Sequence, residues 1–282
     1  MDTERVTVVG AGTMGSGIAH LFALFDFEVT LIDVRESALE QALVSIAANI
    51  DRQIRKGNVT VTARDRALAL ITASIRLEDA SDSGLVLEAA SEDRDLKMEL
   101  FRRLDRLVPS SAILASNTSS LSITEIAAST RRPERVVGMH FMNPAPVMKL
   151  VEVVRGLRTS DETAVRVSEM ARSLGKTVAE ARDFPGFVSN RILMPLINEA
   201  VFCLMEGVAD RDSIDTVMRL GMNHPTGPLE LADLIGLDTC LAIMNVLHDG
   251  LGDDKYRPCP LLKQYVAAGR LGRKSGEGFY TY

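Results

Sequence analysis

Along the first 180 residues, short runs of β-branched and aliphatic residues alternate with longer stretches that mix apolar and polar positions. The short runs are typical of buried strands, and they predict strands at residues 6–9, 28–32, 85–88, 112–115, 135–140 and 149–154. In the longer stretches the apolar residues recur with helical spacing, which predicts helices at residues 14–25, 36–56, 59–71, 96–107 and 123–128. Because strands alternate with helices, we expect βαβ units and an α/β fold with a Rossmann-type, mostly parallel sheet.

After the segment Asp183-Phe184-Pro185-Gly186 the pattern changes, because the apolar positions that follow have only helical spacing. Ile192, Leu196 and Val201 are examples of that spacing. The sequence contains no internal repeat and no low-complexity tract. We therefore predict a Rossmann-type domain followed by an all-helical C-terminal domain, at residues 1–183 and 184–282.

Composition narrows the class of protein. Of the 282 residues, 46% are hydrophobic and 25% are charged, which is ordinary for a globular protein. The formal net charge of −6 argues against a nucleic-acid binder that works through bulk positive charge, and the apolar runs are shorter than the ~18 residues of a membrane span. The first five residues lead directly into a strand, without the charged head and apolar core of a signal peptide. Three cysteines without CxxC spacing favour a reducing compartment, so we expect a cytoplasmic protein with no nucleic-acid or membrane partner.

A glycine-rich turn, Gly10-Ala11-Gly12-Thr13-Met14-Gly15, lies between the first predicted strand and the first predicted helix. In a dinucleotide-binding turn, Gly10 would permit the tight bend, Gly12 would let the backbone approach a pyrophosphate, and Gly15 would let the helix pack closely on the sheet. The first N–H groups of the helix, around Thr13 and Met14, would then face the anion. The alternative is that these glycines only permit a sharp turn.

Asp33 ends the second predicted strand, 21 residues after Gly12, where a carboxylate that binds the ribose hydroxyls belongs. Its negative charge repels a 2′-phosphate, so NAD is favoured over NADP. Arg35 leaves NADP open, because an arginine at this place can accommodate that phosphate. Arg35 can equally be a solvated cation at the start of a helix.

The chain has four histidines, and His140 differs from the other three because it ends a strand at the carboxyl edge of the sheet, where ligands bind in such folds. Glu152 lies 12 residues further on, in the next predicted strand, and is in a position to reach the imidazole. A carboxylate on one ring nitrogen fixes the tautomer, and the other nitrogen can then transfer a substrate proton. A purely structural salt bridge is the alternative.

The other histidines point elsewhere. We expect His20 to be a packed core residue or to lie on a face of its helix, His224 to shape a turn before Pro225, and His248 to lie in a loop. The sequence has neither the HExxH spacing of a zinc site nor a GxSxG nucleophile turn, so no metal is expected.

Six motifs, in order along essentially the whole chain, closely resemble the L-3-hydroxyacyl-CoA dehydrogenases, and the length is similar to that of the short bacterial 3-hydroxybutyryl-CoA dehydrogenases. The motifs are Ser116-Asn117-Thr118-Ser119-Ser120, His140-Phe141-Met142-Asn143-Pro144, Lys149-Leu150-Val151-Glu152-Val153-Val154, residues 183–191, His224-Pro225-Thr226-Gly227-Pro228-Leu229, and residues 272–280. One departure is Thr226, where relatives often carry methionine.

The resemblance implies a role for each matching residue. His140 would be the general acid and base with Glu152 as its partner, and Ser119 and Asn190 would hydrogen-bond the substrate oxygen. Ser119 and Asn190 can alternatively cap helices. Further matching positions lie near the nicotinamide half of the cofactor in that family: Glu92, Lys97, Asn117 and Asn143.

The resemblance also implies that the helix at residues 36–56 faces the phosphates of coenzyme A, with Arg52, Arg55 and Lys56 as substrate-binding cations near its end. The alternative is a basic helix end that complements the helix dipole. In this family the helical domain forms the subunit interface, so we expect a homodimer, with the acyl chain held in the gap between the domains.

The predicted reaction is reversible hydride transfer between C3 of a short (S)-3-hydroxyacyl-CoA and a nicotinamide cofactor. Three other interpretations are weighed against it: a β-hydroxyacid dehydrogenase with a catalytic lysine, a sugar-acid dehydrogenase related to the λ-crystallins, and a non-catalytic protein that binds NAD. The presence of both His140 and Glu152 argues against the first and the third.

Overall fold

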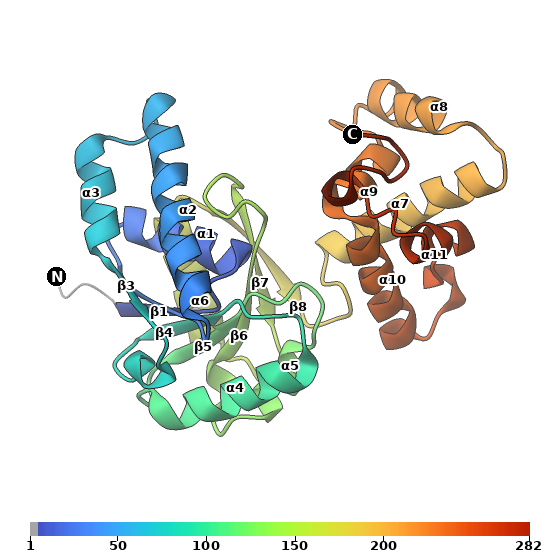
Figure 1. Cartoon of the computed structure of the whole chain (residues 1–282). Helices are drawn as coiled ribbons and strands as arrows, with labels where there is room; N and C mark the ends of the chain where they lie inside the picture. Colours follow the sequence, from blue (N-terminus) through green and yellow to red (C-terminus); the bar gives the residue numbers. More distant parts are fainter. Residues whose placement is uncertain (1–4) are drawn as a thin grey trace. The chain divides into compact units, whose positions relative to one another are not determined.

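The computed structural model describes residues 5–282 and divides into two compact units, of which the first ends at Asp183 and the second begins at Phe184 (Figure 1). The expectation that no signal peptide precedes the first strand concerns residues 1–4, which lie outside the described range. Among the described residues, no single helix has both the length and the apolar composition to cross a membrane. Among these residues, one pair of helices that meet at a bend of 98°, Pro228–Ile235 and Leu237–Leu251, has that length and composition when taken together.

The first unit is built on an eight-stranded sheet with the strand order β3-β2-β1-β4-β5-β6-β7-β8. All neighbouring strands are parallel except β6 and β7, which are antiparallel. This topology confirms the predicted Rossmann-type, mostly parallel sheet. The strands are β1 (Arg5–Val9), β2 (Glu28–Ile32), β3 (Ile71–Ser74), β4 (Leu85–Glu88), β5 (Ile113–Ser116), β6 (Val136–Phe141), β7 (Leu150–Arg155) and β8 (Thr177–Arg182).

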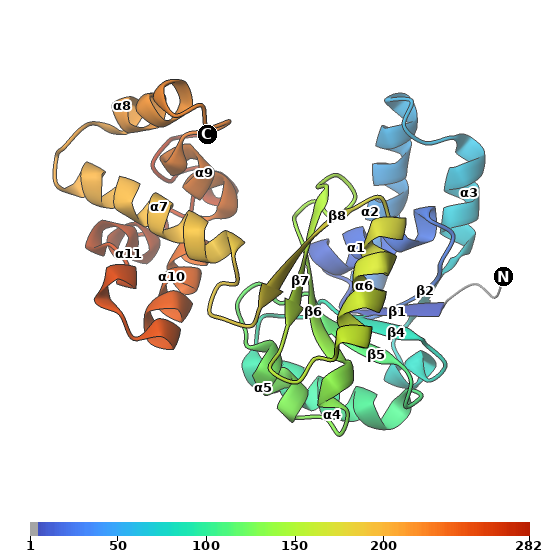
Figure 2. The same ribbon diagram turned by 180° about the vertical axis from the view of Figure 1, so that it is seen from behind.

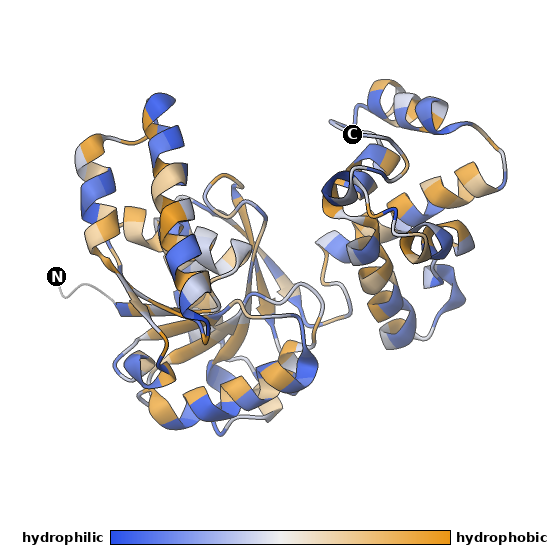
Figure 3. Ribbon diagram, viewed as in Figure 1, coloured by the Kyte–Doolittle hydropathy of each residue, from blue (hydrophilic) through white to orange (hydrophobic). Residues whose placement is uncertain are grey.

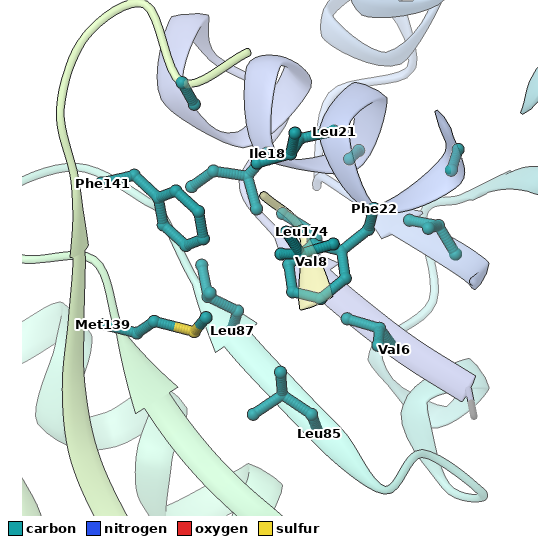
Figure 4. Packing of buried hydrophobic residues seen from close by; sticks show 14 of the residues in the cluster. Val6, Val8, Ile18, Leu21, Phe22, Leu85, Leu87, Met139, Phe141 and Leu174 are labelled. Atoms are coloured by element: carbon teal, nitrogen blue, oxygen red, sulfur yellow. The ribbon is translucent and has the colours of Figure 1, made fainter. Parts of the chain in front are cut away.

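Helices cover both faces of this sheet (Figures 1 and 2). They are α1 (Thr13–Leu24), α2 (Glu36–Arg55), α3 (Val61–Ala69), α4 (Arg94–Leu107), α5 (Ile123–Ala128) and α6 (Asp161–Ser173), with short 3₁₀ turns η1 (Leu77–Ala80) and η2 (Pro133–Arg135). Helices α1, α2 and α6 share one apolar core with the sheet, whereas α4 and α5 lie against the opposite face. Figure 4 shows Ile18 and Phe22 of α1 packed over Val8, Leu87 and Phe141 of the strands.

Two parts of this unit differ from the sequence prediction. The helix predicted at residues 59–71 ends earlier, at Ala69, because Ile71 begins β3 by pairing with Val29 of β2. Helix α6 and strand β8 were not predicted. Helix α6 nevertheless carries a recognisable start signal, since the Ser160 hydroxyl accepts a hydrogen bond from the Thr163 N–H at 3.1 Å.

The second unit is helical, as predicted. Its helices are α7 (Ser189–Met205), α8 (Arg211–Thr216), α9 (Pro228–Ile235), α10 (Leu237–Leu251) and α11 (Pro260–Ala267), with short turns η3 (Val217–Gly221), η4 (Asp254–Tyr256) and η5 (Arg273–Ser275). Figure 3 shows helices with mixed hydrophobic and hydrophilic positions, whose apolar residues, such as Val201, Leu229 and Met244, form one core. His248 lies in the last turns of α10, so its assignment to a loop was wrong; the helix continues to Leu251 before Gly252 ends it.

Two buried carboxylates organise the second unit. The Asp215 carboxylate accepts hydrogen bonds from the N–H groups of Leu229 and Glu230, both at 2.9 Å, at the start of α9. The Asp233 carboxylate accepts from the N–H groups of Phe279 (2.9 Å) and Tyr280 (2.8 Å) in the C-terminal segment. Both residues are about as buried as core side chains, at 2% and 1% exposure. Asp215 therefore fixes the start of α9, and Asp233 fixes where the C-terminal segment packs.

Candidate active site

The glycine-rich turn between β1 and α1 has the geometry of a phosphate cradle. Gly10 has φ +104°, a conformation that side-chain-bearing residues rarely adopt, and a Cβ on Gly15 would lie 1.7 Å from the Gly10 carbonyl oxygen. A Cβ on Gly12 would meet nothing within 4 Å, so the backbone there can be approached closely. No side chain of the described residues caps the N-terminus of α1, and its first turn carries no acidic residue. The helix dipole and N–H groups are therefore available to an anion.

Asp33 follows β2 and is held beside this cradle by the backbone. One carboxylate oxygen, Oδ2, accepts from the Ala11 N–H at 2.9 Å, and Oδ1 accepts from the Arg35 N–H at 3.0 Å. The side chain is only 11% exposed, whereas that of Arg35 is 72% exposed with its Nε 3.7 Å from Oδ1. The fixed negative charge at the cradle therefore belongs to Asp33, and Arg35 partly balances it from the solvent side.

The strand pattern directs several polar side chains to one face of the sheet. Leu87 of β4 and Phe141 of β6 lie in the core that α1 covers (Figure 4). Because neighbouring residues of a strand point to opposite faces, Glu88 and His140 point toward the face that α4 and α5 cover. The carboxyl ends of the parallel strands β4, β5 and β6 thus carry buried polar groups on the same side.

His140 and Glu152 are direct cross-strand partners in the antiparallel β6–β7 pair. The His140 Nδ1 lies 2.8 Å from the Glu152 Oε2, and the two residues are 8% and 2% exposed. The contact expected from the sequence is therefore present. A carboxylate can only accept here, so Nδ1 carries the proton and Nε2 is the nitrogen suited to exchange a proton with a ligand.

Asn117 joins the end of β5 to the end of β6. Its side-chain oxygen accepts from the Phe141 N–H at 2.9 Å, and its own N–H donates to the Glu88 carbonyl at 2.8 Å. The residue expected at the cofactor edge thus also fixes the backbone next to His140.

Glu92 organises the segment after Asn117. Its Oε1 accepts hydrogen bonds from the Thr118 hydroxyl, from the Ser119 N–H at 3.1 Å and from the Ser120 hydroxyl at 3.1 Å. Ser119 is half-buried. The helix-cap alternative for Ser119 is wrong, because the cap of α5 is Ser122.

Lys97, expected near the nicotinamide half of the cofactor, is buried beside Glu92. It is 1% exposed, and its ammonium contacts Glu88 Oε1 at 2.5 Å, the Ala90 carbonyl at 3.3 Å and Glu92 Oε2 at 3.3 Å. These three oxygens match the three N–H bonds of an ammonium, so Lys97 links Glu88 to Glu92. Burial raises the pKa of the Glu88 carboxyl, and the positive charge of Lys97 opposes that shift.

A groove of about 410 Å³ lies between α1, α2 and the loop that joins β6 to β7. Arg52, Asn143 and Thr13 are among the residues that line it. Of the three cations expected to bind coenzyme A, only Arg52 lines the groove. Arg55 is the last residue of α2 and Lys56 follows it, and both are exposed.

Asn190 belongs to the second unit and is the second residue of α7. The cap position of that helix is Val188, so the alternative that Asn190 caps the helix is wrong.

Glu88 and Ser116 were not identified from the sequence as residues of the site. The sign that was available is a glutamate that closes the apolar run Leu85-Val86-Leu87.

Comparisons with known proteins find similarity to one family along the whole chain. The family model described as 3-hydroxyacyl-CoA dehydrogenase, NAD binding domain, matches residues 5–184, and the corresponding C-terminal domain matches residues 186–282. A probable 3-hydroxybutyryl-CoA dehydrogenase of Bacillus subtilis is 57% identical over 282 residues, which is 100% of this chain and 98% of the relative. A 3-hydroxybutyryl-CoA dehydrogenase of Bradyrhizobium diazoefficiens is 53% identical over 279 residues, 99% of this chain and 95% of the relative. The crystal structure of (S)-3-hydroxybutyryl-CoA dehydrogenase PaaH1 from Ralstonia eutropha superposes with a TM-score of 0.97 at 48% identity and covers 100% of this chain and 99% of that one.

Proposed function

Because the chain belongs to the 3-hydroxyacyl-CoA dehydrogenase family, we propose that it interconverts (S)-3-hydroxybutyryl-CoA and acetoacetyl-CoA with NAD as its cofactor. Membership confirms the resemblance read from the six motifs. The observation that carries the proposal is the buried His140–Glu152 pair at the carboxyl edge of the sheet, with the relatives' names supporting the substrate.

The residues that would hold NAD are those of the cradle and its neighbours. Gly10, Gly12 and Gly15 leave the N-terminus of α1 open to the pyrophosphate, and Asp33 would bind the ribose hydroxyls. Thr13, Met14, Glu92, Lys97, Asn117 and Asn143 are proposed as further contacts. When bound, the nicotinamide ring supplies the hydride acceptor or donor.

His140 performs the acid–base step. During oxidation its Nε2 takes the proton of the substrate hydroxyl, and during reduction it returns that proton to the oxygen. Glu152 holds the Nδ1 proton and stabilises the imidazolium that forms. Ser119 and Asn190 are proposed to hydrogen-bond the substrate oxygen, which orients C3 for the transfer.

The first test measures NADH and NADPH oxidation with three acceptors: acetoacetyl-CoA, a longer 3-ketoacyl-CoA and free acetoacetate. We expect the highest kcat/KM with NADH and acetoacetyl-CoA. A preference for the free acid would instead favour the sugar-acid or hydroxy-acid dehydrogenase alternative. A higher kcat/KM with NADPH would show that Arg35 decides the cofactor, and Asp33→Ala would then leave the preference unchanged instead of relaxing it.

We also propose a homodimer formed through the second unit. Large apolar side chains there are exposed, among them Val217 (58%), Leu220 (81%) and Met222 (61%), and apolar patches of this kind mark association surfaces. Light scattering should give a dimer for the wild type and a monomer for Leu220→Glu. Leu157→Glu, at a position 86% exposed in the first unit, is the control that should stay dimeric. A monomeric wild type would rule the dimer out.

A cytoplasmic location is the last part of the proposal. Its support is that Cys203, Cys240 and Cys259 are all free thiols, as expected in a reducing compartment. Cell fractionation tests it.

A further inference from the structure

A buried ion pair that the proposed proton transfer does not use lies beneath the candidate active site. Glu88 and Lys97 are 0% and 1% exposed, and their charged atoms lie 2.5 Å apart. A buried pair of this kind gives little net stability, because the cost of removing both charges from water offsets their attraction. An apolar pair of similar volume would serve the fold as well. The reason for the pair is therefore to be sought in what else the two side chains hold.

Glu88 connects the ends of two strands to the loop that follows β4. Its Oε2 accepts from the Ser116 hydroxyl at 2.6 Å, across the parallel β4–β5 pair. Its Oε1 accepts from the Ala90 N–H at 2.7 Å as well as from Lys97. The Glu88 carboxylate thus accepts three hydrogen bonds from within the chain. The bond from Lys97 fixes the direction of its ammonium group.

The Lys97 ammonium, held in this way by Glu88, lies 3.3 Å from the carboxylate of Glu92 and so orients it. Glu92 in turn accepts from the Ser119 N–H and from the hydroxyls of Thr118 and Ser120. A second branch reaches the same segment from Ser116, whose hydroxyl oxygen accepts from the Thr118 N–H at 3.2 Å. Both branches begin at Glu88.

We propose that Glu88 is a positioning residue of the dehydrogenase reaction, acting through Lys97 and Glu92 to fix the segment 117–120 and with it Ser119. The inference rests on the proposed function, because it assumes that Ser119 holds the substrate oxygen. It assigns Lys97 to the same network: its role is to orient Glu92.

The test uses three variants: Glu88→Gln, Lys97→Met and the double variant that carries both changes. Each single variant leaves one buried charge without its partner and should lose stability. The double variant removes both charges, so its thermal midpoint should recover toward that of the wild type. Its kcat for acetoacetyl-CoA reduction should nevertheless stay roughly ten- to a hundredfold low, the cost of a misplaced site. The KM for NADH should rise by a smaller factor than kcat falls, because the cradle and Asp33 are untouched. Of the proposed cofactor contacts, only Lys97, Glu92 and Asn117 belong to the network or adjoin it.

A matched control is a second buried ion pair, formed by a residue of α4, the helix that carries Lys97. Asp105 of α4 is 3% exposed and pairs with Arg132 at 2.7 Å, but its contacts do not lead to the segment 117–120. Asp105→Asn should lower the thermal midpoint and leave the kcat of the folded enzyme unchanged.

Amide hydrogen exchange gives a readout that does not need activity. The N–H groups of Thr118, Ser119, Ser120 and Leu121 all donate within the network. In the double variant they should exchange about tenfold faster or more, and in Asp105→Asn they should not. A double variant that regains wild-type kcat, or that keeps wild-type exchange in this segment, would overturn the inference. If the wild type binds NADH but does not reduce acetoacetyl-CoA, the proposed function fails, and the exchange result still decides whether Glu88 fixes the segment.

Discussion

The two units use buried carboxylates in different ways. In the first unit, Glu152 faces the titratable ring of His140, and Glu88 faces the ammonium of Lys97. In the second unit, Asp233 is as deeply buried but accepts from backbone N–H groups and from the Tyr282 hydroxyl at 3.1 Å. The difference lies in where the partners lead. Glu152 and Glu88 contact side chains that adjoin the candidate active site, whereas Asp233 contacts backbone amides and a tyrosine of the C-terminal segment, which gives it a structural role.

Asp215 follows the same rule as Asp233. Besides two backbone N–H groups it accepts from the Tyr280 hydroxyl at 2.9 Å. Burial and the neighbouring carboxylate raise the pKa of Tyr280, so this phenol stays protonated and acts only as a donor. Removing the charge of Glu152 or Glu88, which adjoin the candidate active site, should therefore cost rate. Removing the charge of Asp215 or Asp233 should cost stability. The predictions below test that division.

The largest effect is expected at the catalytic pair. His140→Gln should lower kcat by about 10²–10⁴, roughly 3–5 kcal/mol, because the general acid and base is lost. The dissociation constant of NADH should stay nearly unchanged. Steady-state kinetics and NADH fluorescence measure the two quantities, and near-wild-type turnover would remove the mechanism. His20→Gln, the same change at a histidine outside the site, is the control.

Glu152→Gln should also lower kcat, because a neutral amide cannot stabilise the imidazolium. If the pair acts as one unit, the double variant should be little slower than His140→Gln alone. Losses that multiply would mean that Glu152 works independently of His140.

The matching change in the second unit is Asp233→Asn. It replaces a carboxylate that accepts from two N–H groups and a hydroxyl by an amide with one acceptor oxygen. With its oxygen in the place of Oδ2, the amide keeps the bonds from the Tyr280 N–H and the Tyr282 hydroxyl, and only the bond from the Phe279 N–H is lost. The free energy of unfolding should therefore fall by about 2–3 kcal/mol. Urea denaturation measures it, with Asp212→Asn, at an exposed position, as the control. If Asp233→Asn lowered kcat without lowering the free energy of unfolding, the structural role assigned to Asp233 would be wrong.

His20 sharpens the rule, because it is a titratable group of the first unit with a neutral partner. It is fully buried, its Nε2 lies 3.2 Å from the amide nitrogen of Gln53, and burial lowers its pKa from 6.5 to about 4. The unfolded chain therefore takes up a proton as the pH falls below 6.5, while the folded protein does not until about pH 4. This term favours unfolding at low pH and amounts to about 3 kcal/mol by pH 4.

Urea denaturation between pH 7 and pH 4 tests this. Wild type should lose more stability over the interval than His20→Gln, which does not titrate there, and kcat at pH 7 should be the same in both. Parallel pH dependences would mean that His20 is not the group responsible.

The smallest effect is expected from exposed charges. Neutralising Arg52, Arg55 and Lys56 together should raise the KM for acetoacetyl-CoA by about two- to fivefold, since exposed ion pairs contribute about 1 kcal/mol or less. The KM for NADH should change less, and added salt should shrink the effect. Arg52→Gln alone should account for most of it, because only Arg52 lines the groove. An unchanged KM for acetoacetyl-CoA at low salt would mean that none of the three cations binds coenzyme A and that they only complement the dipole of α2.

The sequence predicted the fold class and the His140–Glu152 contact because both depend on local patterns: strand alternation and a motif on two consecutive strands. It did not predict β3 or the partnership of Glu88 with Lys97. The four residues of β3 form a strand only because β2 lies alongside, and the nine-residue separation of Glu88 and Lys97 crosses a loop whose course the pattern does not contain. Burial of a lysine is likewise decided by tertiary packing, since most lysines are exposed.

The antiparallel register of β6 and β7 also bears on how this enzyme can diverge. His140 and Glu152 are held opposite each other by the strand ladder, while the residues between the strands, 142–149, include Asn143 of the groove. Insertions or deletions in that connection leave the ladder in place, so an evolving or engineered enzyme can reshape its groove without separating His140 from Glu152. A single residue inserted within either strand turns the following side chains to the opposite face. Natural variation in length is therefore expected to collect in the connection and to be absent from the strands on either side of it.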